Sequence, residues 1–107
     1  MILRQATATL QNLAQGYPIL AITGPRQAGK TTLAQNTFPD KPYVSLEDPD
    51  TRAFAQDDPR GFLARFDGGA VLDEVQRCPS LFSYLQTRVD KNKQMAEFVL
   101  TGSQQFG

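Results

Sequence analysis

Residues 24–31 carry the strongest chemical signal in the sequence. They match G-x-x-x-x-G-K-[ST] at every fixed position, a loop whose glycines let the backbone curl around phosphate oxygens. The N–H groups of such a loop bind anions, and the dipole of the following helix adds positive charge. Lys30 is expected to reach the β- and γ-phosphates and the Thr31 hydroxyl to coordinate Mg²⁺, while Thr32 supports the turn. The expected nucleotide contacts are Gly24, Pro25, Arg26, Gln27, Ala28, Gly29, Lys30, Thr31 and Thr32.

Two carboxylates, Asp73 and Glu74, follow the apolar run 70–72. An acid pair directly after a buried strand is costly unless it meets metal or water. Asp73 suits holding a water molecule on magnesium, and Glu74 suits deprotonating an attacking water. The alternative interpretation is a pair of surface acids at a strand-to-loop boundary, but the preceding phosphate loop favours the catalytic one. A GTPase would show Asp-x-x-Gly here, whereas Asp73 is followed by Glu-Val-Gln.

A third group of polar residues follows the apolar residues 97–100. In P-loop ATPases that activate water, a strand between the phosphate-loop strand and the acidic strand ends in a polar side chain that senses the γ-phosphate. Thr101 or Ser103 could take this role. An ordinary strand-to-loop turn explains the same residues equally well, so the local signal leaves both interpretations open.

These residues need strands and helices to position them. Short apolar runs predict strands over 19–23, 43–46, 70–73 and 97–101. Helix signals, including Asp58 before Pro59, predict helices over 2–15, 29–36, 50–56 and 59–66, and one that opens at Pro79. Strands that alternate with helices indicate an α/β three-layer sandwich with a mostly parallel sheet, in which ligands sit at the carboxyl ends of the strands.

Composition narrows the class of protein. The chain has 107 residues, 40% hydrophobic, with 11 basic and 11 acidic side chains, so it lacks the basic excess typical of nucleic-acid binding. Five acids within 47–58 indicate a solvated acidic face. With Cys78 alone and no histidine, a disulfide or a structural zinc site is not expected. No signal-peptide pattern or long apolar run is present, which favours a cytoplasmic protein without a membrane span.

The motifs together resemble one family. The chain is similar to the ATPase domain of bacterial and archaeal AAA-superfamily ATP-binding proteins that carry a C-terminal domain of unknown function. The resemblance extends over nearly the whole chain, and the stretches 46–50 and 101–104 are its most specific parts, although they leave the roles of Glu47 and Asp48 open. The segments that carry it are 23–33, 43–50, 58–63, 72–77 and 100–104.

The resemblance implies a P-loop NTPase fold in which residues 1–107 are the N-terminal part of the ATPase domain, truncated after about four core strands. Family members continue with a further strand, a lid region and the second domain. An arginine acting on the γ-phosphate would come from that part or from a neighbouring subunit, so hydrolysis is expected in the full-length or assembled protein. The fragment itself is expected to be marginally stable, because the sheet lacks an edge strand.

Several functions are compatible with a phosphate loop and an acidic pair. The leading hypothesis is an ATPase in which water attacks the γ-phosphate, aided by Mg²⁺, Lys30 and Glu74. The alternatives are a non-hydrolysing module in which ATP sets a conformation for a partner, a P-loop kinase and an inactive fragment. Glu74 favours water over a bound acceptor as the nucleophile, but it does not separate hydrolysis from regulation. The expected ligands are ATP and Mg²⁺, self-association is expected only for the full-length protein, and the protein client is unknown.

Overall fold

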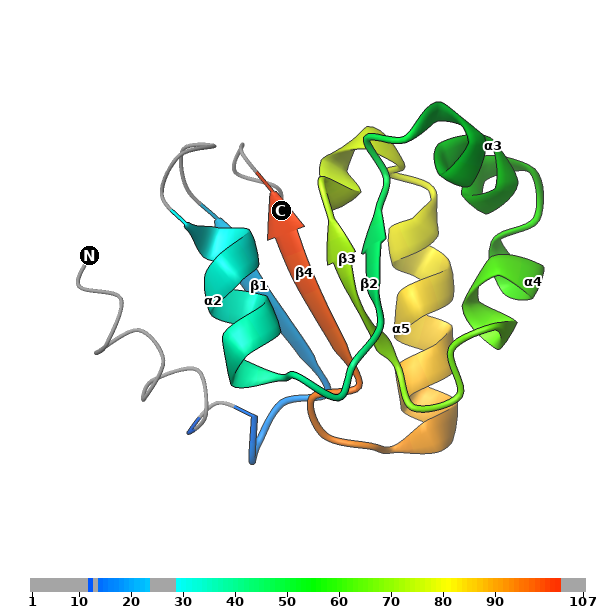
Figure 1. Ribbon diagram of the computed structural model, residues 1–107. Coiled ribbons are helices and arrows are strands. Elements are labelled where there is room, and N and C mark those ends of the chain that lie inside the picture. Colours follow the sequence, from blue (N-terminus) through cyan, green and yellow to red (C-terminus); the bar gives the residue numbers. More distant parts are fainter. Residues whose placement is uncertain (1–11, 13, 24–28, 103–107) are drawn as a thin grey trace.

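The computed structural model describes residues 12, 14–23 and 29–102. Its strands are β1 (Ile19–Thr23), β2 (Tyr43–Ser45), β3 (Ala70–Asp73) and β4 (Phe98–Gly102). They form one sheet in the order β1-β4-β3-β2, and each neighbouring pair is parallel. β4, the last strand of the described chain, therefore lies between β1, which precedes the phosphate loop, and β3, which ends at Asp73 of the acidic pair, as the sequence predicts (Figure 1).

Helices connect the strands and cover both faces of the sheet (Figure 1). They are α2 (Lys30–Thr37), α3 (Pro49–Asp57), α4 (Pro59–Ala64), the 3₁₀ turn η1 (Val75–Arg77) and α5 (Leu81–Asn92). On one face, Leu33 of α2 packs with Leu20, Val71 and Val99 of the sheet. On the other face, side chains of α3, α4 and α5 pack against the alternate strand residues, which include Leu72, Phe98 and Leu100. The result is a three-layer α/β sandwich, which confirms the predicted fold class.

The predicted strands lie within one residue of the observed ones. The signals at helix starts are also confirmed, because Asp58 caps α4 by accepting a hydrogen bond of 3.1 Å from the Gly61 N–H. The helix expected to open at Pro79 begins at Leu81 instead, since Pro79 and Ser80 form the turn that leads into it. The helix predicted over 2–15 falls mainly outside the described residues.

A buried ion pair connects the start of β4 with helices α5 and α4. Glu97 is fully buried, and its Oε2 accepts hydrogen bonds from Nε of Arg88 at 2.9 Å and from Nδ2 of Asn92 at 2.8 Å. The guanidinium of Arg88 also donates to the backbone carbonyls of Leu63 and Phe66 at the end of α4. Because a buried charge needs a partner, this network joins β4, α5 and α4 into one packed unit.

Within the described part of the chain, no helix is long and apolar enough to cross a membrane.

Candidate functional site

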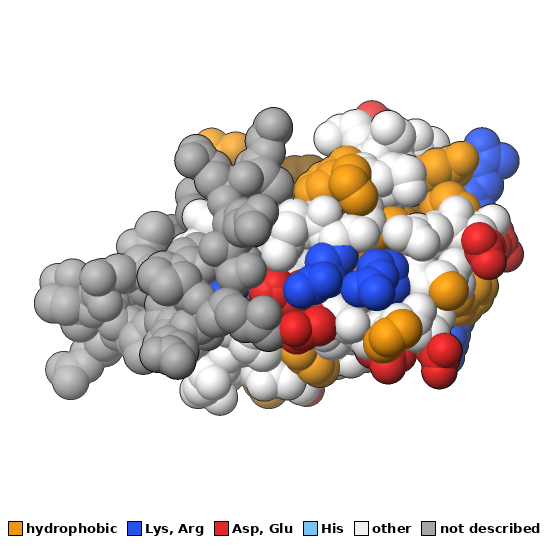
Figure 2. All heavy atoms as spheres, turned by 90° about the horizontal axis from the view of Figure 1, so that it is seen from above, with side chains coloured by type: hydrophobic (Ala, Val, Ile, Leu, Met, Phe, Trp, Pro, Cys, Tyr) orange, Lys and Arg blue, Asp and Glu red, His pale blue; other side chains and the backbone are white. Residues whose placement is uncertain are grey.

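Three side chains predicted from the sequence meet at the carboxyl edge of the sheet. Oδ1 of Asp73, the last residue of β3, accepts a hydrogen bond of 2.6 Å from the Thr101 hydroxyl of β4. The same oxygen accepts a longer bond of 3.3 Å from the Thr31 hydroxyl in the first turn of α2. Figure 2 looks down on this end of the molecule and shows acidic side chains next to basic ones. Residues far apart in the sequence thus supply a carboxylate and two hydroxyls, which are hard oxygen donors of the kind Mg²⁺ prefers.

The start of α2 lies beside this group. Gly29, which precedes the helix, has φ 75°, a left-handed conformation that glycine adopts without strain. Lys30 follows as the first residue of the helix and is 5% exposed, whereas Thr32 lies exposed. The other expected phosphate contacts, Gly24, Pro25, Arg26, Gln27 and Ala28, lie outside the described residues, as does Ser103.

Tyr43 is a contact of this site that the sequence analysis missed. Its phenolic hydroxyl donates a hydrogen bond of 2.6 Å to Oδ2 of Asp73. Partial burial, followed by the bond to this carboxylate, raises the pKa of Tyr43 to about 12, so the phenol stays protonated and remains a donor at neutral pH. The sequence signal was strand alternation, which places Tyr43 and Ser45 on one face of their strand. The structure then pairs Ser45 with Asp73, so that Tyr43 and Asp73 share this face of the sheet.

Glu74 turns the chain sharply after β3. Its backbone is left-handed, with φ 55° and ψ 43°, and it leads directly into η1. This conformation is uncommon for residues other than glycine and often marks functional positions. The side chain is 4% exposed, and its Oε2 accepts a hydrogen bond of 3.0 Å from Nε2 of Gln76. Glu74 is therefore a buried, oriented carboxylate, and Gln76 is a second contact that the sequence analysis missed.

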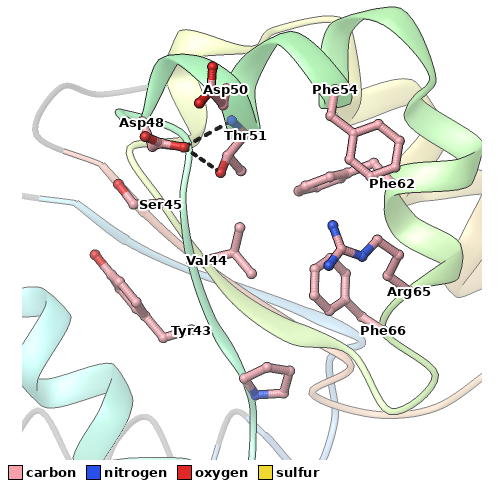
Figure 3. Close-up of a pocket in the computed structure, with 11 residues that line it drawn as sticks. Tyr43, Val44, Ser45, Asp48, Asp50, Thr51, Phe54, Phe62, Arg65 and Phe66 are labelled. Atoms are coloured by element: carbon pink, nitrogen blue, oxygen red, sulfur yellow. Dashed lines mark hydrogen bonds between the residues drawn. The ribbon is translucent and has the colours of Figure 1, made fainter.

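The acidic segment after β2 has a structural explanation. Asp48 is the N-cap of α3, and its Oδ2 accepts hydrogen bonds from the Thr51 N–H at 3.0 Å and the Thr51 hydroxyl at 2.8 Å (Figure 3). These bonds lower the pKa of Asp48 below its ordinary value. Glu47 lies in an exposed ion pair with Arg77 at a long distance of 3.9 Å, and such pairs contribute little to stability. The solvated acidic face predicted for this segment thus also caps a helix.

A pocket of about 620 Å³ lies beside β2, the edge strand of the described sheet. Val44 points into it toward Phe62, while Phe54 and Phe66 line its far side with Arg65 (Figure 3). The ring of Tyr43 points away from this pocket, on the opposite side of β2 from Val44 (Figure 3). Because the Tyr43 hydroxyl bonds to Asp73, the pocket and the Asp73 carboxylate lie on opposite sides of β2.

Comparisons with known proteins agree with this architecture. Residues 16–107 match the family described as AAA domain. An uncharacterized protein of Mycobacterium bovis and another of Mycobacterium tuberculosis are each 38% identical to the chain over 103 residues. These matches cover 94% of this chain but 23% of each relative, so the chain spans about a quarter of their length. No solved structure matches the chain.

Proposed function

The chain belongs to the AAA domain family, and from that premise we propose that it binds ATP with Mg²⁺ and takes part in ATP hydrolysis. The observation that supports this most is the contact of the Thr31 and Thr101 hydroxyls with one oxygen of Asp73. A helix start, a carboxylate and a polar strand end converge there, at the edge where parallel α/β sheets bind ligands.

The residues present fit a magnesium nucleotide. We assign Thr31 as a direct ligand of the ion and Asp73 as a residue that holds its water, because both present hard oxygen atoms. The bound ion would neutralise charge on the β- and γ-phosphates. The phosphate loop, residues 24–29, would surround the phosphates, and the backbone N–H groups of Gly24, Arg26, Gln27, Ala28 and Gly29 would supply the donors, since Pro25 has none.

Lys30, Glu74 and the γ-phosphate sensor have separate roles in the proposed reaction. Lys30 places a positive charge on the β- and γ-phosphates. Glu74 accepts a proton from water as the water oxygen bonds to the γ-phosphorus, and the bond to the β,γ-bridging oxygen breaks to release ADP and phosphate. Thr101 is the candidate sensor of the γ-phosphate, with Ser103 as the second candidate. The role of Glu74 as the proton acceptor is supported by its burial and by its hydrogen bond from Gln76, since both restrict the carboxylate.

The setting of the reaction is part of the proposal. We propose that the complete protein carries a second domain and self-associates, and that an arginine from elsewhere completes the site, because the relatives are about four times as long as the match. A cytoplasmic location suits the single cysteine, Cys78, which is buried and forms no disulfide.

Calorimetric titration of ATP with and without Mg²⁺ tests the binding proposal. We expect magnesium-dependent binding by the unmodified chain and its loss in Lys30→Ala, because the phosphates lose a point charge. The matched control is Lys91→Ala, which removes an exposed lysine of α5 and should bind as the unmodified chain does. Unchanged binding by Lys30→Ala would refute the assignment of Lys30, and no binding by the folded unmodified chain would refute the proposal for this chain.

A further inference from the structure

Asp73 is held by hydroxyl groups on both of its carboxylate oxygens. Oδ1 accepts from Thr31 and Thr101, at 3.3 and 2.6 Å, whereas Oδ2 accepts from Tyr43 at 2.6 Å. The three donors come from α2, β4 and β2, and thus from three separate segments of the chain. A carboxylate that is bonded at only one oxygen can rotate about its terminal torsion, which has a broad energy profile. A donor on the second oxygen removes that freedom.

The sheet accounts for the reach of Tyr43. Its Cα pairs with that of Val71, two residues before Asp73, so both side chains leave the same face of neighbouring parallel strands. The ring extends along that face, away from the pocket that Val44 enters (Figure 3). The 2.6 Å bond is as short as expected for a hydroxyl that donates to an ionised carboxylate.

We propose that Tyr43 is a positioning residue of the magnesium site: by holding Oδ2, it keeps Oδ1 of Asp73 turned toward the Thr31 hydroxyl. The inference rests on the proposed binding of magnesium and ATP. Partners that orient the ligands of a metal ion commonly change its affinity by ~10- to 100-fold when they are removed. Tyr43 touches neither nucleotide nor metal in this proposal and acts through Asp73.

A purely structural role of Tyr43 would have different consequences. β2 has only three residues, so the Tyr43–Asp73 bond could serve simply to fasten this edge strand to β3. In that case loss of the hydroxyl would lower the melting temperature and leave the dependence of ATP binding on Mg²⁺ unchanged. The two roles are therefore separated by a magnesium titration and not by stability alone.

The experiment is a titration of Mg²⁺ at fixed, subsaturating ATP, followed through a fluorescent ATP analogue, on the unmodified chain, Tyr43→Phe and Tyr84→Phe. Tyr84 is the matched control, because it loses the same hydroxyl on α5, where its ring lies next to the guanidinium of Arg60 on α4 and not next to Asp73. We expect Tyr43→Phe to raise the half-saturating Mg²⁺ concentration by ~10-fold. Binding of the nucleotide without Mg²⁺ should stay within about twofold, and Tyr84→Phe should match the unmodified chain.

Each outcome decides one proposal. Equal half-saturating Mg²⁺ concentrations in the unmodified chain and Tyr43→Phe would overturn the role of Tyr43 while leaving the proposed function intact. A weaker binding of nucleotide in Tyr43→Phe even without Mg²⁺ would also overturn it, because the effect would then reach beyond Asp73. If the unmodified chain shows no response to Mg²⁺, the proposed function itself fails, and the inference fails with it.

Discussion

The hydroxyl of Thr101 lies 2.6 Å from Oδ1 of Asp73 and joins the ends of two adjacent parallel strands, β4 and β3. Thr101 is fully buried, so its hydroxyl has no access to solvent. A hydrogen bond to an ionised carboxylate is stronger than one between neutral groups. The strand between the phosphate-loop strand and the acidic strand is thereby linked directly to the proposed magnesium carboxylate.

Replacing this hydroxyl should affect both stability and binding. Thr101→Val keeps the side-chain shape but removes the donor, and we expect the free energy of unfolding to fall by about 1–3 kcal/mol. Binding of magnesium and ATP should weaken, because Asp73 loses a partner on Oδ1. Urea unfolding and calorimetry would measure the two effects. Thr87→Val is the matched control, since its exposed hydroxyl bonds only to the Ser83 carbonyl of the same helix; an equal loss of stability there would contradict the prediction.

Glu74 should affect turnover more than binding. In Glu74→Gln the amide keeps the size of the side chain but does not accept a proton from water, so hydrolysis by the complete protein should slow by ~10²- to 10⁴-fold. ATP affinity should change little. Phosphate release under saturating ATP measures the rate. Glu47→Gln, which neutralises an exposed carboxylate in a weak ion pair, is the control. Equal turnover of Glu74→Gln and the unmodified protein would remove Glu74 as the general base.

Two neighbouring glycines should respond differently to alanine. Gly69 has φ 90°, and a Cβ there would lie 1.5 Å from the backbone oxygen of Glu97, so the chain would have to move. We expect Gly69→Ala to lower the free energy of unfolding by about 2–4 kcal/mol. Gly68→Ala is the control, because a Cβ at Gly68 meets no atom within 4 Å. Thermal and urea unfolding of both variants would test this, and similar stabilities would show that the close approach to Glu97 is not maintained.

The helix cap at Asp48 predicts a pH dependence. Because the hydrogen bonds from Thr51 lower the pKa of Asp48, the cap stabilises the fold above the unfolded-state pKa. That contribution is lost as the pH falls through the lower folded-state pKa. In Thr51→Val the hydroxyl donor is absent, so the pKa should rise toward its ordinary value in an NMR titration of the carboxyl carbon.

Asp48→Asn provides the control for that titration. Asparagine caps helices without an ionisable group, so this variant should lose the part of the acid dependence of unfolding that belongs to Asp48. An unchanged pKa of Asp48 in Thr51→Val would show that the hydroxyl does not hold the carboxylate.

Local signals were sufficient for the fold class and for much of the candidate site. The apolar run 70–72 specifies a strand, β3, whose apolar residues are all buried. The run 19–23 also forms a strand, but the expectation that it is buried on both faces is wrong, because β1 is an edge strand of the described sheet and its residues alternate between buried and exposed. Asp58 before Pro59 marks a helix start because both residues satisfy the first turn locally. The phosphate-loop motif and the acidic pair were visible for the same reason, since each is a contiguous stretch of chain.

The tertiary structure alone decided which distant side chains meet. Tyr43 and Asp73 are 30 residues apart, and they touch only because β2 is placed next to β3 with their residues in parallel register. Arg88 reaches both Glu97 and the carbonyl of Leu63 because α5 packs between β4 and α4. Strand order and helix packing depend on the burial of the whole core, which no single stretch of sequence encodes. The sequence by itself thus determined the elements and the chemical groups, and packing determined their partners.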